Sequence, residues 1–446
     1  WRLGFFTKEV LDMKENNNTS RPPLKERVLS SVRPIGQKSD ALVTSKSDVM
    51  KKFASSLWQK MRYFDLWLLV PYVVLLFFGA LMVYSASVWW GIVQYDYEPN
   101  HFYIRQMIFA TLGFVIFMVT VFVKKQLYTS PVPVAVFAGI TVLMLIYVRL
   151  MGWGDGAGAR SWFSLFGINV QPAEVAKLAI IVVMTVMLTH FLKRRHADEL
   201  LTKHYALLFA YPLLCIVLVA SQPDSGAVAV MLSLVMGIFI VTGVSARRYM
   251  RMFGGVVIAA VAAALIGVLT GYISGNRLGR LKAWLDPFEY QTIEGYQVIQ
   301  GYVAIGSGGL GGVGLGHSAQ KLGYLPEPHT DFIMAVISEE LGFIGVLIVV
   351  VLLYTIVCRA LIIALKTPDL HTRFLAAGIG TWIGIQTFVN LGGMLGFIPL
   401  TGVTLPFVSY GGTSMVLLSL SMGILMNISI HEKVRQSKQR KPETAA

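Results

Sequence analysis

The stretch Leu66-Trp-Leu-Leu-Val-Pro-Tyr-Val-Val-Leu-Leu-Phe-Phe-Gly-Ala-Leu-Met-Val-Tyr-Ser-Ala-Ser87 carries no charged side chain. A helix of about 20 predominantly apolar residues is long enough to cross the hydrocarbon core of a bilayer. In lipid, only helices and closed barrels satisfy all of their backbone hydrogen bonds internally. This stretch therefore predicts a membrane-spanning α-helix, and it sets the class of the protein.

The rest of the chain has the same character. Of its 446 residues, 55% are hydrophobic and only 14% are charged, and the mean hydropathy is +0.63. Because a soluble domain carries roughly 25% charged residues, lipid must cover the excess of apolar side chains. We predict an all-α, polytopic integral membrane protein with about ten transmembrane helices. The apolar runs are 66–87, 104–123, 132–150, 173–192, 205–220, 226–243, 253–273, 332–358, 374–395 and 408–430.

Clusters of Lys and Arg alternate along the chain with loops that are poorer in basic residues or balanced by acids. The clusters precede the first predicted helix and follow the second, fourth, sixth, eighth and tenth. Because cytoplasmic loops carry the excess of Lys and Arg, both termini are predicted to be cytoplasmic. The same orientation places the longest loop, residues 274–330, outside the cytoplasm between helices 7 and 8. Long loops with motif character usually carry function.

Composition divides the chain into three parts. Residues 1–62 are predicted to be a disordered cytoplasmic segment, residues 63–431 the membrane domain, and residues 432–446 a basic cytoplasmic tail. The net charge of +14 comes from loop clusters without an aromatic-interleaved basic face, so topology and anionic lipid explain it better than nucleic acid. Cys215 and Cys358 lie inside apolar runs and predict neither a disulfide nor a metal pair.

Basic residues, carboxylates and glycines converge on the loop 274–330. Basic side chains there are suited to hold a phosphate-bearing headgroup. Glycines let backbone amides approach anionic oxygens, and a carboxylate near an apolar boundary can act as a base. The alternative is a flexible loop with solvated charges, and the ordered string at 324–331 favours a functional site instead. The loop contains Arg277, Arg280, Lys282, Asp286, Glu289, a glycine-dense run at 306–316, Glu327 and His329, and Asp331 follows it.

Some charged residues lie inside or at the ends of predicted spans. Glu174 and Lys177 are three apart and share one helix face. Ionisable groups at membrane depth are costly, so this pair is either part of the site or a structural ion pair. Glu339 and Glu340 leave the same two alternatives open. The Pro- and Gly-containing hairpin 401–414 indicates either broken backbone that lines a cavity or turn chemistry alone.

Metal and hydrolase signatures are weak. His329 and Asp331 are close in sequence, but no compact ligand cluster with zinc spacing is found. A Ser-His-Asp hydrolase would need a nucleophile-elbow motif, which the sequence does not contain. No metal-binding residue is predicted.

Four strings in these regions resemble signature motifs of the SEDS family. The resemblance covers about residues 64–430 and matches a ten-span topology. The string at 320–329 is more similar to that of FtsW, the division member, than to that of RodA, the elongation member. The four strings are Gln171-Pro-Ala-Glu-Val-Ala-Lys177, Gly295-Tyr-Gln followed by Ala304-Ile-Gly-Ser-Gly-Gly309, Gln320-Lys-Leu-Gly-Tyr-Leu-Pro-Glu-Pro-His-Thr-Asp-Phe-Ile333, and Leu405-Pro-Phe-Val-Ser-Tyr-Gly-Gly412.

The resemblance implies a peptidoglycan glycosyltransferase that polymerises lipid II at the outer face of the bacterial cytoplasmic membrane, at the division septum. The implied partners are lipid II, a class B penicillin-binding protein transpeptidase and other division proteins. No cofactor is certain, and a divalent cation (Mg²⁺ or Mn²⁺) is the one that pyrophosphate chemistry suggests. Two alternatives remain, a lipid II flippase and a non-catalytic division scaffold.

The resemblance also suggests site residues. Family members carry the proposed catalytic Asp a few residues after an Asp-Pro or Asn-Pro, and a gap-free match puts Tyr290 at that place. The expected base is therefore Asp286, followed by Glu289. By similarity, Glu174 and Lys177 match a pair beside the catalytic loop. The other candidates for binding substrate are Arg160, Arg277, Arg280, Lys282, Glu327, His329 and Asp331.

Overall fold

The computed structural model describes residues 61–154, 160–165, 167–193, 205–270, 276–291 and 294–440. The described residues from Tyr63 onward form one compact unit. The predicted disorder of residues 1–62 concerns a segment that lies outside the described residues, apart from its last two. The predicted basic tail is helical through Arg440, and residues 441–446 also lie outside the described part.

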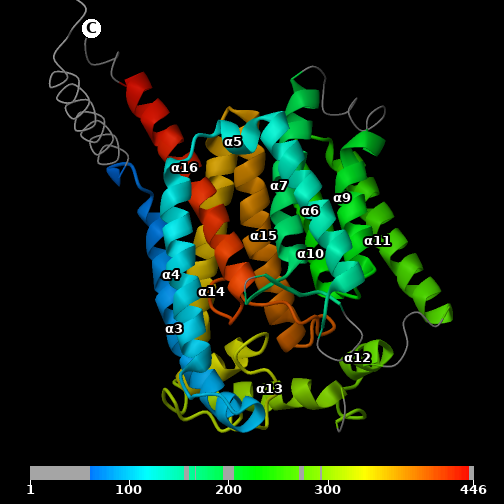
Figure 1. Ribbon diagram of the computed structural model, residues 1–446, viewed down its shortest axis with the longest axis vertical. Coiled ribbons are helices and arrows are strands. Elements are labelled where there is room, and N and C mark those ends of the chain that lie inside the picture. The colour runs from blue at the N-terminus through cyan, green and yellow to red at the C-terminus, as the bar shows by residue number, and fades with distance from the viewer. Residues whose placement is uncertain are drawn as a thin grey trace, which may run out of the picture. The chain divides into compact units, whose positions relative to one another are not determined.

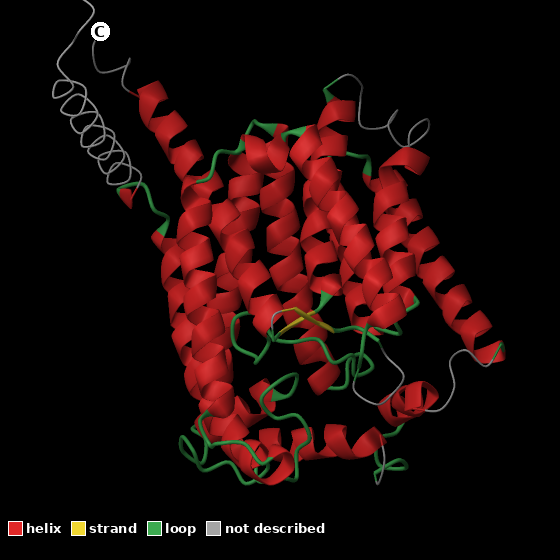
Figure 2. Cartoon of the chain, viewed as in Figure 1, coloured by secondary structure: helices red, strands yellow, loops and turns green. Residues whose placement is uncertain are grey.

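Long helices that run side by side make up nearly all of the described chain (Figures 1 and 2). Each of the apolar runs predicted from the sequence overlaps one of them. The long helices are α3 (Leu66–Tyr95), α4 (His101–Phe122), α6 (Pro131–Met151), α7 (Pro172–Leu192), α9 (Tyr205–Ala220), α10 (Ser225–Ile240), α11 (Ala246–Leu269), α14 (Ile333–Lys366), α15 (Leu370–Met394) and α16 (Gly412–Arg440).

Shorter elements connect the long helices. They are α5 (Gln126–Thr129), the antiparallel strands β1 (Phe163–Leu165) and β2 (Ile168–Val170), α12 (Asn276–Leu285) and α13 (Glu294–Gly308). Helices α12 and α13 belong to the large loop and lie across the end of the bundle opposite to the C-terminus (Figure 1). This is the end that the charge pattern predicts to face outward.

The predicted fold class is confirmed. Within the described ranges, seven helices are long and apolar enough to cross a membrane, namely α3, α4, α6, α7, α14, α15 and α16. Helices α9 and α10 are shorter apolar helices. Several predicted ends were wrong, because hydropathy marks the lipid-covered part of a helix and not its full length. Helix α3 continues to Tyr95, α11 begins at Ala246 within the Arg-rich segment, α14 continues to Lys366, and α16 begins at Gly412.

Helices α7, α15 and α16 are the most deeply buried of these seven helices, with about three quarters of their apolar windows inside the protein. Helix α7 has almost no polar face, because buried residues follow one another from Pro172 to Thr185. A helix that is apolar on all sides belongs in a core surrounded by other helices. This central position holds Glu174 and Lys177, near the start of α7, inside the bundle.

Asp65, directly before α3, joins three helices at the end of the bundle where the C-terminus lies. Its buried carboxylate accepts hydrogen bonds from Arg359 Nε of α14 at 2.7 Å and from Ser429 Oγ of α16 at 2.9 Å. Lys433 Nζ lies 3.7 Å from the other carboxylate oxygen. A buried charge needs such partners, and these three hold the start of α3 against α14 and α16.

Helix α14 is broken at Gly342, where φ is 67° and ψ is −167°. The glycine-dense run that follows α13 fills the break, since the amides of Val313 and Gly314 donate to the carbonyls of Glu339 and Glu340 at 2.9 and 3.0 Å. These amides are therefore used inside the protein. The glycines of this run permit close packing against α14. The prediction that the run approaches an anionic ligand was therefore wrong for these two amides.

Gly308 offers a test of this packing. A methyl group at Gly308 would overlap the carbonyl oxygen of Ser338, whereas a methyl group at Gly306, also in α13, would meet no atom within 4 Å. Gly308→Ala is expected to destabilise the protein by about 1–3 kcal/mol, as overpacking of a close contact does. Gly306→Ala should be neutral or slightly stabilising, because Ala is the better helix former. Thermal unfolding in detergent, followed by tryptophan fluorescence, measures both, and equal melting temperatures would contradict the packing argument.

Candidate functional site

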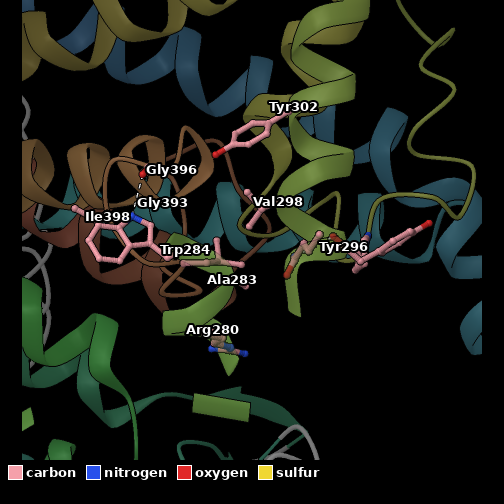
Figure 3. Close-up of a pocket in the computed structure, with 12 residues that line it drawn as sticks. Arg280, Ala283, Trp284, Tyr296, Val298, Tyr302, Gly393, Gly396 and Ile398 are labelled. Carbon is pink, nitrogen blue, oxygen red and sulfur yellow. Dashed lines mark hydrogen bonds between the residues drawn. The ribbon is translucent and has the colours of Figure 1, made fainter. Parts of the chain in front are cut away.

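A cavity of about 210 Å³ lies between α12, α13 and the segment that follows α15. It is on the outer side of the bundle, beside the loop that carries the predicted site residues. Figure 3 shows Trp284 of α12 beside Gly396 and Ile398, with Val298 and Tyr296 of α13 across from them. The cavity is lined by Arg280, Ala283, Trp284, Tyr296, Gln297, Val298, Tyr302, Pro326, Gly393, Gly396, Ile398 and Leu400.

Two aromatic side chains are fixed around Gly396. The indole Nε1 of Trp284 donates to the carbonyl oxygen of Gly396 at 2.9 Å. Gly396 has φ of +75°, and a methyl group there would overlap the hydroxyl of Tyr302. Gln297 Nε2 of α13 donates to the carbonyl oxygen of Pro326 at 3.2 Å. Hydrogen bonds therefore hold parts of the cavity wall in place. The absence of a side chain at Gly396 leaves the space that the Tyr302 hydroxyl occupies.

Arg280 and Asp331 form the charged part of this region. Arg280 is exposed on α12, and Asp331 is half-buried directly before α14. Burial raises the pKa of Asp331, while the hydrogen bond from Thr330 Oγ1 at 3.0 Å and the charge of Arg280 oppose that rise. A carboxylate with a raised pKa next to a cation is a common feature of sites that transfer protons.

Glu174 and Lys177 form a buried ion pair below this region, with Nζ and Oε1 2.6 Å apart. Lys177 Nζ also donates to Gln386 Oε1 at 3.2 Å, and Gln386 accepts from Trp382 Nε1 at 2.7 Å. Gln386 Nε2 in turn donates to the carbonyl oxygen of Thr404 at 3.0 Å. Since these partners use the ammonium of Lys177, it is engaged inside the bundle. The other oxygen of Glu174 has no hydrogen-bond partner in the described part of the chain.

The segment 401–405 connects the buried pair with Asp331. Asn390 Nδ2 of α15 donates both to the carbonyl oxygen of Asp331 and to that of Val403, each at 2.8 Å. A methyl group at Gly402 would lie 4.0 Å from Asp331 Oδ2. The predicted hairpin 401–414 is thus a segment without regular structure at 401–405, then turns and bends at 406–410, then the start of α16. Irregular backbone of this kind is tolerated at membrane depth where it is buried in protein or lines a cavity.

Asp286 and Glu289 are exposed at the end of α12. Asp286 Oδ1 accepts the backbone N–H groups of Phe288 and Glu289, both at 3.1 Å, and so closes the turn that follows the helix. Trp284, two residues earlier, lines the cavity. The two expected base residues therefore border the cavity region without lining it.

The basic candidates are spread over the outer face. Arg160 is exposed and donates to the carbonyl oxygen of Leu150 at 3.4 Å. Lys282 is exposed, with Nζ 5.9 Å from the centre of the Tyr290 ring. The side chain of Arg277 lies outside the described residues. Of the predicted basic residues whose side chains the structure describes, Arg280 is the one that lines the cavity.

His329 and Glu327 shape the loop before α14. The buried ring of His329 lies against Phe102 and Tyr410, with ring centres 4.6 and 5.7 Å apart, and its carbonyl accepts the N–H of Tyr410 at 2.9 Å. Glu327 has φ of 49°, and its Oε2 accepts from Thr330 Oγ1 at 3.1 Å. Burial lowers the pKa of His329 to about 4, so the imidazole is neutral at physiological pH. These two residues hold the conformation that presents Asp331.

The lowered pKa of His329 predicts a pH-dependent stability. Between its ordinary value of 6.5 and about 4, the unfolded chain binds a proton that the native imidazole does not bind. Stability therefore falls as the pH is lowered through this window, by about 3 kcal/mol in total for this group. His329→Phe keeps a ring against Phe102 and Tyr410 and should remove that part of the pH dependence. Melting temperatures in detergent from pH 4.5 to 7.5 measure it.

His317→Ala is the matched control, because His317 is exposed. It should follow the wild-type pH dependence. If His329→Phe did so too, the buried neutral imidazole would not be a source of acid sensitivity.

A second buried ion pair holds the loop that leads into the site. Lys321 Nζ lies 2.6 Å from Glu340 Oε1, and the Ser85 hydroxyl of α3 donates to both oxygens of Glu340 at 2.7 and 2.9 Å. Glu339 accepts the hydroxyl of Ser318 and the amide of Ala319. Both glutamates therefore bind the loop 318–321, which supports the structural alternative that the sequence left open for them.

Several residues of this region were not predicted as site residues from the sequence. Lys321 and Tyr296 were inside the quoted motif strings, but their partners are distant in sequence. Gln386 and Asn390 had a usable signal, because polar residues four apart in an apolar run share one helix face. As for metals, no group of three or more His, Cys, Asp or Glu side chains in the described ranges is arranged to hold an ion.

The chain is similar to known proteins over most of its length. A family model described as cell cycle protein (FtsW/RodA/SpoVE) matches residues 66–434. The probable peptidoglycan glycosyltransferase FtsW of Bacillus subtilis (strain 168) is 39% identical over 389 residues, which cover 86% of this chain and 95% of that protein. Stage V sporulation protein E of the same organism is 34% identical over 375 residues, which cover 83% and 98%.

Solved structures agree with these relatives. A chain from the work on "Structural coordination of polymerization and crosslinking by a peptidoglycan synthase complex" matches with a TM-score of 0.65 and 27% identity, covering 82% of this chain and 97% of that one. The rod shape determining protein RodA of Thermus thermophilus matches with a TM-score of 0.58 and 26% identity, covering 82% and 96%. Motifs, fold and relatives thus lead to one conclusion: the chain is a multi-pass membrane protein that belongs to the FtsW/RodA/SpoVE family, the SEDS family that its motifs resemble.

Proposed function

We propose that this protein is a peptidoglycan glycosyltransferase that polymerises lipid II at the outer face of the bacterial cytoplasmic membrane during cell division. The observation that carries the proposal is a cavity lined by Arg280 at the outer end of a lipid-embedded bundle, formed in part by the helix α12 that Asp286 follows. The names of the relatives that cover most of the chain support the same activity. A substrate with a prenyl tail would enter such a site from the bilayer.

The proposed reaction is a single displacement. A carboxylate of the outer loop takes the proton of the acceptor sugar's 4-hydroxyl, and that oxygen attacks the anomeric carbon of the donor. The bond to undecaprenyl pyrophosphate breaks, the pyrophosphate leaves with the bonding electrons, and the anomeric centre is inverted. Positive side chains stabilise the leaving charge. The candidates for that role are Arg160, Arg277, Arg280 and Lys282.

Three carboxylates are candidates for the base. The family pattern supports Asp286 first and Glu289 next, and their exposure leaves both accessible to a substrate. The raised pKa of Asp331 and its proximity to Arg280 support it as a third. Asp286 is our first choice, since it follows the cavity-lining Trp284 by two residues.

The proposed partners are a class B penicillin-binding protein, which would cross-link the glycan, and other division proteins at the septum. The similar chain from a peptidoglycan synthase complex supports a transpeptidase partner. A divalent cation is a proposed cofactor without an assigned site, because no group of three or more His, Cys, Asp or Glu side chains in the described part of the chain is arranged to hold it. No step of the reaction above is routed through a metal.

The test is polymerisation of purified lipid II by the full-length protein in detergent, with and without chelator and with and without its cognate transpeptidase. Glycan strands are expected, and their synthesis in chelator would remove the cation from the proposal. Movement of lipid II across vesicles without glycan synthesis would favour a flippase. Normal division by cells whose protein makes no glycan would favour a scaffold, and either result would overturn the proposed function.

A further inference from the structure

The cavity between α12, α13 and Gly396 combines flat aromatic rings with a limited set of polar side-chain groups, which belong to Arg280, Gln297 and the rings themselves. The indole of Trp284 is held in place by its hydrogen bond to Gly396. Among the described residues, the Tyr302 hydroxyl has no hydrogen-bond partner and Arg280 forms no ion pair. Figure 3 shows Trp284 and Tyr302 on either side of Gly396, with Arg280 near one end of the cavity. These free groups are available to a ligand.

The size of the cavity limits what it can hold. Its volume is about 210 Å³. Pockets for drug-sized ligands occupy roughly 300–1,000 Å³, so this one has room for a single ring and not for a disaccharide with its peptide. The ligand is therefore one part of a larger substrate, and the rest of that substrate must lie outside the cavity.

The lining favours an uncharged sugar ring. The face of a pyranose presents C–H groups with partial positive charge, and the faces of aromatic rings carry partial negative charge. Among the side chains that the structure describes, Arg280 is the one charged residue in the lining, whereas a pyrophosphate is ordinarily bound by several cations or amides. A hexose with an N-acetyl group offers both a C–H face for the indole and a carbonyl oxygen for Arg280 or Tyr302.

We propose that this cavity binds one N-acetylated hexose ring at the acceptor end of the glycan, with Trp284 as its stacking surface. The inference rests on the proposed glycosyl transfer and specifies which part of the substrate occupies this place. The position agrees with the chemistry, because Trp284 is two residues from Asp286, and Arg280 is close enough to Asp331 to affect its pKa.

The experiment uses the full-length protein in lipid nanodiscs and saturation-transfer NMR with the β-1,4-linked disaccharide of N-acetylglucosamine. Trp284→Ala is expected to weaken binding about tenfold, the effect of losing an aromatic contact surface. Trp284→Phe keeps a ring and loses only the indole N–H, so it should bind within about threefold of the wild type. Phe288→Ala is the control, because Phe288 is 64% exposed and does not line the cavity, and its binding should be unchanged.

Two results would overturn the inference. One is disaccharide binding by Trp284→Ala that equals the wild type. The other is binding of inorganic pyrophosphate that displaces the disaccharide, which would assign the cavity to the leaving group. Trp284-dependent sugar binding in a protein that makes no glycan would support the subsite and overturn the proposed function. Glycan synthesis by Trp284→Ala with an unchanged acceptor KM would support the function and overturn the subsite.

Discussion

Asp286→Asn is expected to reduce lipid II polymerisation by about 10²–10⁴-fold, the usual contribution of a general base. The amide oxygen of Asn can still accept the N–H groups of Phe288 and Glu289, so the turn after α12 should persist and the loss should be chemical. Glu289→Gln should reduce the rate much less. The measurement is the initial rate of glycan formation by the purified variants, compared at equal amounts of folded protein.

Glu98→Gln is the matched control, because Glu98 is an exposed carboxylate on the outer side, away from the cavity. Full activity in both Asp286→Asn and Glu289→Gln would remove the assignment. If Asp331→Asn alone abolished the reaction, Asp331 would become the base. The raised pKa of Asp331 would then make the rate fall, as the pH is lowered, at a higher pH than for an ordinary carboxylate.

Lys321→Ala is expected to destabilise the protein by about 3–5 kcal/mol, because it leaves Glu340 buried without its cation. Glu340 is fully buried, and its other hydrogen-bond donor is the hydroxyl of Ser85. The double variant Lys321→Met/Glu340→Gln removes both charges and should recover most of the loss. Chemical unfolding in detergent measures these differences.

Lys366→Ala provides the control, since Lys366 is exposed at the end of the same helix as Glu340. Its stability should match the wild type. A Lys321→Ala protein that is as stable as Lys366→Ala would show that Glu340 does not depend on this cation. Polymerisation by the double variant would also report whether the ion pair positions the loop 326–331 or only stabilises it.

The fold was largely predictable from the sequence, because lipid imposes length and polarity on every spanning helix. The helix ends were less predictable. Helix α14 continues to Lys366 across the break at Gly342, and amphipathic or polar segments such as Asn276–Leu285 form helices that no run of apolar residues marks. Such elements depend on contacts with distant parts of the chain, and hydropathy does not report those contacts.

The site was predictable as a region but not as an arrangement. The sequence indicates that the outer loop carries charges, and in the structure the charge of Arg280 acts on Asp331 there. The sequence does not indicate that Lys177 binds Gln386, because these residues are far apart in the chain. It also does not indicate that Glu340 pairs with Lys321, because several charged residues could have been its partner. Pairings of this kind follow from tertiary packing and not from periodicity.

The position of Asp65 has a consequence for biogenesis. Two of its partners, Ser429 and Lys433, lie in α16, and Ser429 is synthesised 364 residues after Asp65. The carboxylate before α3 therefore remains incompletely paired until α16 has been made. Insertion can proceed helix by helix, but α16 must leave the ribosome before this end of the assembly becomes stable, so chains truncated before α16 should be substrates for membrane quality-control proteases.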